Sequence, residues 1–315
     1  MTPPLIVPRK LERLTGVPHA IPYQGSKRRL AHTIVPLIPV GAPRLLEPFA
    51  GSAAISIASK FSGAVGVAVI SDVNESLMKL WRSLLDDASA LADSYEQLWH
   101  EQLEDPRSFY DEVRRKFNAT QEPHHFLYLL ARCVKAAVRY NRHGEFNQGA
   151  DHRRLGAKPA AMRKRLLETS KVMTGTLVMN GDYREILDMA QPSDVVYMDP
   201  PYEGVTNVRD HRYMQGVDRS EFEGSLADAV NRNVSFVLSY DGAMGGKQYG
   251  KPLPDALGML HLHLHAGRSS QATLQGLDHD TVESLYLSPA LVARLGGEPA
   301  VLASLEVAYT QDALI

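Results

Sequence analysis

The sequence has one cysteine, no long apolar run and almost no net charge. Because Cys133 is alone among 315 residues, an internal disulfide and a cysteine-based metal cluster are both excluded. Its apolar helical surroundings predict a buried thiol. No uncharged stretch of about 18 apolar residues occurs, so we expect no membrane span. The Pro-rich start does not resemble a signal peptide, and together these absences predict a cytoplasmic protein.

The net charge of −2 does not by itself favour a nucleic-acid partner, but the distribution of charge matters more than its sum. Between residues 132 and 165 only Glu145 and Asp151 oppose a basic surplus, which could neutralise several phosphates. An ordinary solvated face is the alternative interpretation. The basic residues are Arg132, Lys135, Arg139, Arg142, Arg153, Arg154, Lys158, Arg163, Lys164 and Arg165.

Apolar runs and helical patterns alternate at both ends of the chain, which predicts an α/β fold with a mostly parallel sheet covered on both faces. Its length suits one large domain or two smaller ones. Residues 81–170 are mainly helical, and we predict that they form an inserted subdomain between the two parts of a catalytic domain, 1–80 and 171–315. We expect strands at 44–50, 66–74, 176–180, 194–199, 235–242, 259–267, 280–289 and 303–310, and helices at 53–61, 75–99, 109–119, 124–140 and 221–233.

The segment Asp199-Pro200-Pro201-Tyr202 follows a buried strand. Two prolines stiffen the loop and keep Asp199 out of helical geometry, and the carboxyl end of a strand is where open α/β sheets bind ligands. The Asp199 carboxylate and the Pro200 carbonyl could accept the two hydrogens of an amino group on a flat base. Tyr202 could stack on that base. The alternative is a stiffened turn with an exposed Asp199.

Further motifs accompany this loop along the chain: Pro22–Arg28 (PYQGSKR), Glu47–Ala53 (EPFAGSA), Ser71–Asn74 (SDVN) and Asn180–Tyr183 (NGDY). With them, the chain resembles the DNA adenine methyltransferase (Dam-like) family, whose fold is Rossmann-like. The resemblance implies an S-adenosylmethionine site, with Asp72 on the ribose, Asp182 near the adenine and the turn after Glu47 under the methionine moiety. The cofactor-binding residues it implies are Tyr23, Lys27, Pro48, Phe49, Ala50, Gly51, Ser52, Asp72, Val73, Asp182, Tyr183 and Asp199.

The most specific string is Arg139–Asn147 (RYNRHGEFN), which is similar to R-Y-N-x-x-G-E-F-N in the DNA-binding part of that family. The resemblance therefore implies that the helical insert contacts double-stranded DNA. The DNA-binding residues we predict are Arg139, Asn141, Arg142, Asn147, Arg153 and Arg154.

Two positions depart from the family pattern: Pro22 replaces a lysine, and Ala53 replaces the second glycine of the cofactor turn. Because glycine permits close contact, Ala53 could weaken cofactor binding. We expect no metal, since the alternating His261, His263 and His265 have no carboxylate at a suggestive spacing and are expected to face solvent.

The predicted reaction is methyl transfer from S-adenosylmethionine to N6 of a flipped-out adenine in duplex DNA, with S-adenosylhomocysteine as product. Three alternatives stay open: N4-cytosine methylation, for which Ser is more common than Asp199; RNA or protein-glutamine methylation, for which Asn is typical; and an inactive DNA-binding protein on the same scaffold. We expect a monomer of prokaryotic or phage type. A cognate restriction endonuclease and the recognition site are left open.

Overall fold

The computed structural model describes residues 3–7, 10–201, 217–244, 247–249, 251–268 and 280–306. Within these residues a single nine-stranded sheet has the order β1-β8-β9-β6-β5-β2-β3-β4, with β7 paired to β6. The strands are β1 (Leu5–Ile6), β2 (Arg44–Glu47), β3 (Val67–Asp72), β4 (Leu177–Asn180), β5 (Val195–Met198), β6 (Phe236–Met244), β7 (Lys247–Tyr249), β8 (Leu260–Arg268) and β9 (Asp280–Leu287).

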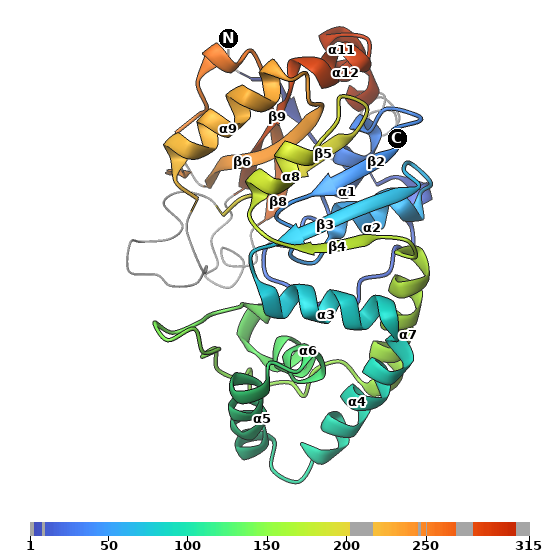
Figure 1. The fold of residues 1–315 in the computed structure, drawn as a ribbon, viewed down its shortest axis with the longest axis vertical. Coiled ribbons are helices and arrows are strands. Elements are labelled where there is room, and N and C mark those ends of the chain that lie inside the picture. The colour runs from blue at the N-terminus through green and yellow to red at the C-terminus, as the bar shows by residue number, and fades with distance from the viewer. Residues whose placement is uncertain are drawn as a thin grey trace.

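The strands from β6 to β4 along this order pair in parallel, whereas β9 pairs antiparallel with both β6 and β8. The predicted α/β class with a mostly parallel sheet is confirmed. In Figure 1 the carboxyl ends of β2 and β3 point to the left of the view.

Both faces of the sheet are covered, as predicted. All four residues of β5 are buried, with Val195 and Tyr197 in one core and Val196 and Met198 in the other. The first core also takes side chains from α1 (Ala31–Ile34), α2 (Ala54–Phe61), α11 (Pro289–Arg294) and α12 (Glu298–Glu306). The second takes them from α8 (Tyr183–Met189) and α9 (Arg219–Asn231), which lie in front of the sheet in Figure 1.

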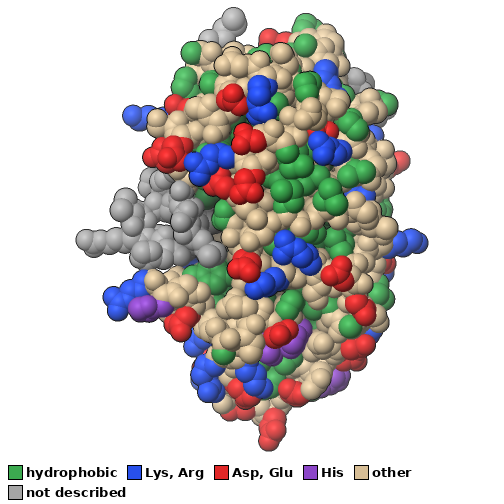
Figure 2. Space-filling view, viewed as in Figure 1, with side chains coloured by type: hydrophobic (Ala, Val, Ile, Leu, Met, Phe, Trp, Pro, Cys, Tyr) green, Lys and Arg blue, Asp and Glu red, His purple; other side chains and the backbone are tan. Residues whose placement is uncertain are grey.

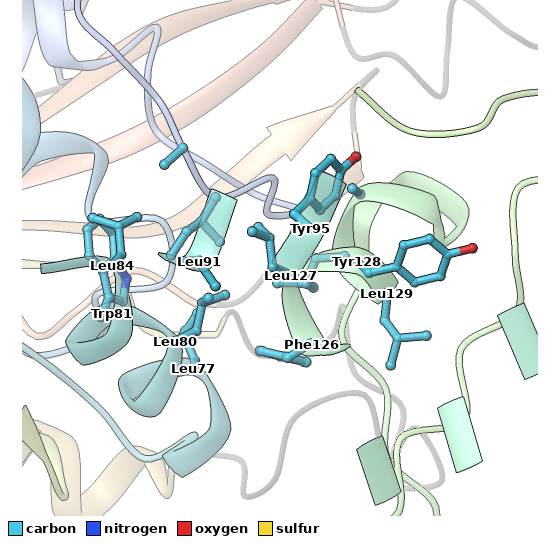
Figure 3. Packing of buried hydrophobic residues seen from close by; sticks show 14 of the residues in the cluster. Leu77, Leu80, Trp81, Leu84, Leu91, Tyr95, Phe126, Leu127, Tyr128 and Leu129 are labelled. Carbon is cyan, nitrogen blue, oxygen red and sulfur yellow. The ribbon is translucent and has the colours of Figure 1, made fainter. Parts of the chain in front are cut away.

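The helical part lies beyond β4 in Figure 1 and comprises α3 (Glu75–Asp86), α4 (Ala88–Glu101), α5 (Pro106–Thr120), α6 (Pro123–Arg132) and α7 (Pro159–Val172). One apolar cluster joins Leu77 and Trp81 of α3 to Tyr95 of α4 and Phe126 of α6, as Figure 3 shows. The same cluster includes Ala50 and other residues next to the sheet, so α3 packs on both parts. Residue 81 lies within α3, and the predicted division at 81–170 stays a prediction.

Two predicted helices were too long. The helix expected over 75–99 is divided at Asp87, whose side chain accepts hydrogen bonds from the amides of Ser89 and Ala90 and caps α4. A capping carboxylate of this kind satisfies amides that a continuous helix would bond internally. The helix expected over 124–140 ends before Cys133, which is extended and bridges to Ala150.

The strand predicted over 303–310 was wrong where the structure describes it, because residues 303–306 belong to α12. Gly296 and Gly297, both at φ +93°, precede this helix, and Val301 and Leu305 bury one side of it. The spacing of four residues between these two side chains is typical of a helix. This periodicity, and not the apolar run that predicted a strand, matches the observed structure. No helix in the described ranges is long and apolar enough to cross a membrane.

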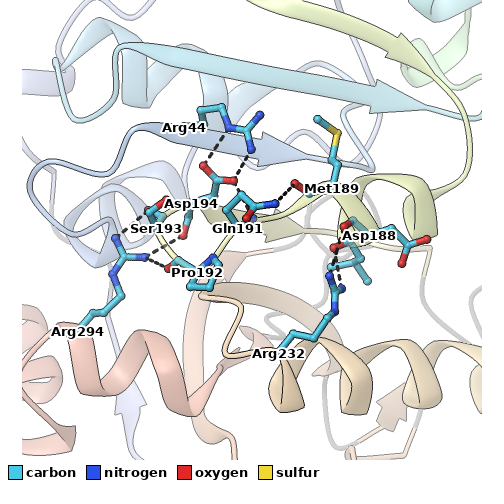
Figure 4. Close-up of polar contacts among 10 residues, drawn as sticks. Arg44, Asp188, Met189, Gln191, Pro192, Ser193, Asp194, Arg232 and Arg294 are labelled. Carbon is cyan, nitrogen blue, oxygen red and sulfur yellow. Dashed lines mark hydrogen bonds and ion pairs between the residues drawn. The ribbon is translucent and has the colours of Figure 1, made fainter.

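The amino-terminal end of β5 is fixed by two arginines (Figure 4). Asp194, which is 1% exposed, accepts two hydrogen bonds from the Arg44 guanidinium, at 2.6 and 3.0 Å. Arg294 donates to the carbonyls of Pro192, Ser193 and Asp194. This network anchors the end of β5 opposite to Asp199.

Candidate functional site

Three neighbouring parallel strands end in acidic residues at one edge of the sheet. Glu47 is the last residue of β2, Asp72 is the last residue of β3, and Asp199 follows β5. Since β2 lies between β3 and β5 in the sheet, the three carboxylates belong to one cluster of strand ends. This edge is where open α/β sheets bind ligands.

The turn after β2 packs closely on the N-terminal segment. Gly51 has φ +47°, and a Cβ at this position would lie 3.2 Å from two ring carbons of Tyr23. The carbonyl of Gly51 accepts a hydrogen bond from Nε1 of Trp81, and the Ser52 hydroxyl contacts that of Ser26 at 2.7 Å. The turn is therefore held by the N-terminal segment on one side and by α3 on the other. Pro48 and Ala50 are also buried within it.

Ala53, the departure from the family pattern, has a left-handed backbone with φ +47° and ψ +40°. This region is strained for alanine, whereas glycine and occasionally Asn or Asp adopt it. The side chain is nevertheless fully buried, in the apolar cluster that also holds Ile57 and Leu77. The Ala53 methyl therefore occupies the core behind the turn.

Asp72 accepts a hydrogen bond from the Gly51 amide at 3.1 Å and another from the Asn74 amide at 3.0 Å. Burial raises the pKa of Asp72, and these two bonds oppose that rise. The carboxylate thus joins the turn after β2 to the start of α3. The next residue, Val73, is 47% exposed, so an apolar side chain faces outward beside the acid.

Phe49 and Tyr183 connect the turn to the start of α8, because their rings stack with centroids 5.4 Å apart. Asp182 caps α8 and accepts hydrogen bonds from the amide and Nε of Arg184. Asn180 donates to the carbonyl of Asp72 at 2.8 Å. The structure therefore brings together the predicted residues of β2, β3 and β4.

The Asp199 carboxylate pairs with Lys27, with 3.1 Å between Oδ1 and Nζ. Glu283 of β9 contacts the same ammonium at 3.4 Å from Oε2. Burial opposes the charged form of Lys27, but Asp199 and Glu283 outweigh it and raise the pKa of the ammonium well above its ordinary value. Lys27 is therefore a permanent cation shared by two acids. Pro200 is buried and Pro201 is half-buried beside it.

Glu47 is 3% exposed and accepts hydrogen bonds from the amide and hydroxyl of Ser56, at 2.8 and 2.5 Å. Burial raises the pKa of Glu47 to about 7, and the negative charge of Asp199 contributes to that rise. The carboxyl therefore exchanges a proton near neutral pH.

Residues 139–147 form a short hairpin that projects to the left in Figure 1, the same side as the carboxyl ends of β2 and β3. Tyr140 bridges to Phe146, and Oδ1 of Asn141 accepts from the amides of His143 and Glu145. Arg142 is exposed in the turn. Arg139 is half-buried and Asn147 is exposed, so the hairpin carries four of the predicted DNA-binding residues.

The other two predicted DNA-binding residues, Arg153 and Arg154, lie beside Asp151. Arg153 makes a bidentate salt bridge with that carboxylate. Arg154 contacts both Asp151 and the carbonyl of Cys133. Arg132 is 1% exposed and donates to backbone carbonyls, among them that of Pro106. Part of the basic surplus is thus used inside the helical part. Figure 2 shows basic and acidic side chains interspersed over the face drawn there.

Tyr202 lies outside the described residues. Sequence reasoning missed Glu283, which contacts Lys27, and Trp81, which holds the turn. The sequence also did not indicate that the hydroxyl of Tyr140 contacts Oδ1 of Asn74, at 3.2 Å. Glu283 could have been found, because it shares a strand face with the apolar Leu285 and Leu287.

The single cysteine and the alternating histidines were weaker candidates for a functional site. Cys133 is buried and unpaired by a disulfide, as predicted. His261 is half-buried rather than solvent-facing and stacks on Tyr286 at 4.2 Å. Among the described residues, no group of three or more His, Cys, Asp or Glu side chains is placed to hold a metal ion.

Comparison with known protein families gives a match over residues 23–252 to the D12 class of N6 adenine-specific DNA methyltransferases. The chain belongs to this family. The match contains the turn after β2, Asp72, the hairpin and Asp199, so it covers the ends of the three strands that carry the acidic residues. The resemblance to Dam-like enzymes that the motifs indicated is confirmed.

Several curated proteins are similar to the chain. It is 29% identical over 188 residues to the retron Ec67 DNA adenine methylase of Escherichia coli, covering 58% of this chain and 62% of that protein. It is 26% identical over 233 residues to the DNA N-6-adenine-methyltransferase of Escherichia phage P1, covering 70% and 29%. A type II methyltransferase of Lactococcus lactis is 28% identical over 191 residues, covering 57% and 64%. The chain thus matches less than two thirds of the length of each relative.

Proposed function

We propose that this D12-class chain transfers a methyl group from S-adenosylmethionine to N6 of an adenine flipped out of duplex DNA. The observation that carries the proposal is the position of Asp199 and Pro200 at the end of β5, beside the strand that leads into the turn after β2 and two strands from Asp72. Hydrogen-bond acceptors for an amino group thus lie beside the sheet edge that is expected to bind the nucleotide part of the cofactor.

The chemistry follows from the amine of adenine, whose lone pair is delocalised into the ring. The Asp199 carboxylate and the Pro200 carbonyl would accept the two amino hydrogens and direct the lone pair outward. A carboxylate offers about four acceptor positions, so one carboxylate can pair with Lys27 and also accept from an amine. The same negative charge would stabilise the positive charge that develops on the nitrogen. Stacking of Tyr202 on the base stays a prediction.

The residues at the edge fit S-adenosylmethionine, which supplies the methyl group when bound and leaves as S-adenosylhomocysteine. Asp72 has the acceptor chemistry that ribose hydroxyls need, and the exposed Val73 beside it offers an apolar contact for the adenine ring. Gly51 keeps the backbone of the turn within contact distance of Tyr23, where a Cβ would crowd the ring. We assign Lys27, Phe49, Ser52, Asp182 and Tyr183 to the same cofactor site.

The proposed DNA surface is the hairpin at 139–147, because it projects from the helical part on the side where the strands end. Arg142 and Asn147 are exposed on it, whereas Arg153 is tied to Asp151. We therefore expect Arg142 to contact DNA directly and Arg154 to support the hairpin through the carbonyl of Cys133.

Methylation can be tested with purified protein, labelled S-adenosylmethionine and unmethylated duplex DNA. We expect label on N6-methyladenine, and Asp199→Ala should abolish it while the fold and most of the cofactor binding are retained. Asp228→Asn is the matched control, since it removes one acid paired with Arg232 on α9. Label on N4 of cytosine would show that cytosine, and not adenine, is the methylated base. No label with any DNA would refute the proposal.

DNA contact can be tested by binding at several salt concentrations. Arg142→Ala should weaken binding to all duplexes and reduce the salt slope by about 1, as expected for the loss of one phosphate contact. Arg163→Ala is the control, because Arg163 is already paired with Asp93 and Glu96. Equal losses in both variants would contradict the assignment of the hairpin.

The proposal extends to partners and to cellular location. The Lactococcus lactis relative is named a type II methyltransferase, which gives a reason to search for a cognate restriction endonuclease. We infer a monomer that works on DNA in the cytoplasm. Sequencing of methylated bases in cells that express the gene would identify the target site.

A further inference from the structure

The contact between Lys27 and Glu283 joins parts of the sheet that do not pair with each other. Asp199 follows β5 and Glu283 lies on β9, and β6 separates these two strands. The Lys27 side chain, 11% exposed, nevertheless reaches both carboxylates, which are 20% and 18% exposed. One ammonium therefore connects the acid at the end of β5 to an acid two strands away.

The position of Glu283 on its strand is unusual for an acid. Leu285 and Leu287 share its face of β9 and are both fully buried in the core behind the sheet. A carboxylate on such a face is costly unless it is paired. A residue chosen for stability alone would be apolar here, so the presence of Glu283 requires another reason.

We attribute the presence of Glu283 to its negative charge, which attracts Lys27. If Lys27 paired with Asp199 alone, the ammonium would cancel the negative charge that the reaction needs and would draw the carboxylate toward itself. Because its distances to the two acids are 3.1 and 3.4 Å, Glu283 attracts Lys27 about as strongly as Asp199 does. Glu47 is a further acid near Asp199, so among the described residues three carboxyl groups and one ammonium lie close together at this edge.

We propose that Glu283 is a positioning residue for the methylation reaction: it balances Lys27 so that Asp199 keeps both its place and its charge. This inference rests on the proposed function of Asp199 and adds a residue that lies outside the family match, which ends at residue 252. Glu283 acts through Lys27 and needs no contact with DNA or cofactor.

The test compares Glu283→Gln and Glu283→Asp with the wild-type protein in steady-state methylation. We expect Glu283→Gln to lower kcat by about 10- to 100-fold, the loss typical of a displaced reacting group, with KM for DNA and for S-adenosylmethionine unchanged within about twofold. Glu283→Asp keeps the charge and should recover most of the lost kcat. Asp228→Asn, which removes an equal charge from a distant ion pair, should match the wild type.

The outcomes separate the inference from the function on which it rests. A wild-type kcat in Glu283→Gln would overturn the inference and leave the proposed function intact. An equal loss in Glu283→Gln and Glu283→Asp, accompanied by a lower Tm in both, would also overturn it, because packing and not charge would then be the cause. Wild-type protein that methylates no DNA would refute the proposed function instead.

Discussion

Protonation of Glu47 should make the free energy of unfolding depend on pH, and the substitution Glu47→Gln should remove this dependence. Burial raises the pKa of Glu47 in the folded protein to about 7, whereas its ordinary value is 4.5. The folded state therefore binds this proton more tightly than the unfolded chain does. The contribution to stability is fully present below about pH 4.5 and is lost as the pH rises toward 7.

The magnitude follows from the two pKa values, because each pKa unit is worth about 1.4 kcal/mol. Integrated between about pH 5 and about pH 8, the shift removes about 2.5 kcal/mol from the free energy of unfolding. Glu47→Gln has no proton to lose, and the amide oxygen can still accept from Ser56. Relative to the wild type, the variant should thus gain about 2.5 kcal/mol over this pH range.

The assay is urea unfolding of both proteins across that range, followed by circular dichroism. Only the difference between the two curves is used, so other titrating groups cancel. Glu101→Gln on the exposed surface of α4 is the control for the same change of side chain away from the cluster. Asp199→Asn should move the Glu47 transition to lower pH, since the charge of Asp199 contributes to the shift. A flat difference for Glu47→Gln would refute the reasoning.

The other predictions concern the turn and the anchor of β5. Gly51→Ala should lower the free energy of unfolding by about 1–2 kcal/mol and weaken binding of S-adenosylmethionine measured by calorimetry, because φ is positive and the new Cβ would meet Tyr23. Ala53→Gly should change the free energy of unfolding by less than about 0.5 kcal/mol, since relief of about 1 kcal/mol of strain offsets the loss of a buried methyl worth about 0.8 kcal/mol. Asp194→Ala should cost about 2–3 kcal/mol in urea unfolding by leaving Arg44 unpaired, without changing kcat.

Most of the sheet could be predicted because its strands are short apolar runs that end at chemically distinctive residues. Residues 44–47, 67–72 and 195–198 are strands as expected, and each leads into a predicted site residue. The helix ends were harder. Asp87 stops a helix that the apolar pattern would continue, because its side chain competes locally for the amides that follow it.

The basic surplus shows a different limit. The sequence window between 132 and 165 contains few acids, yet Arg163 pairs with Asp93 and Glu96, which come from another helix. Arg132 is buried and serves backbone carbonyls. Charge balance is set by neighbours in space, so a window of sequence overstates the positive charge that is available to DNA.

Glu283 illustrates both a predictable strand pattern and a charge partner that is set by neighbours in space. Its strand was predicted, and alternation along that strand already put residue 283 on the same side as Leu285 and Leu287. An acid on a face that is otherwise apolar requires a nearby cation, and Lys27 was already a predicted site residue. What the sequence could not supply was the distance across β6 that lets one lysine reach both β5 and β9. Charged residues on the apolar face of a predicted strand are thus the positions to examine first for a second partner of the cation that pairs with a catalytic acid.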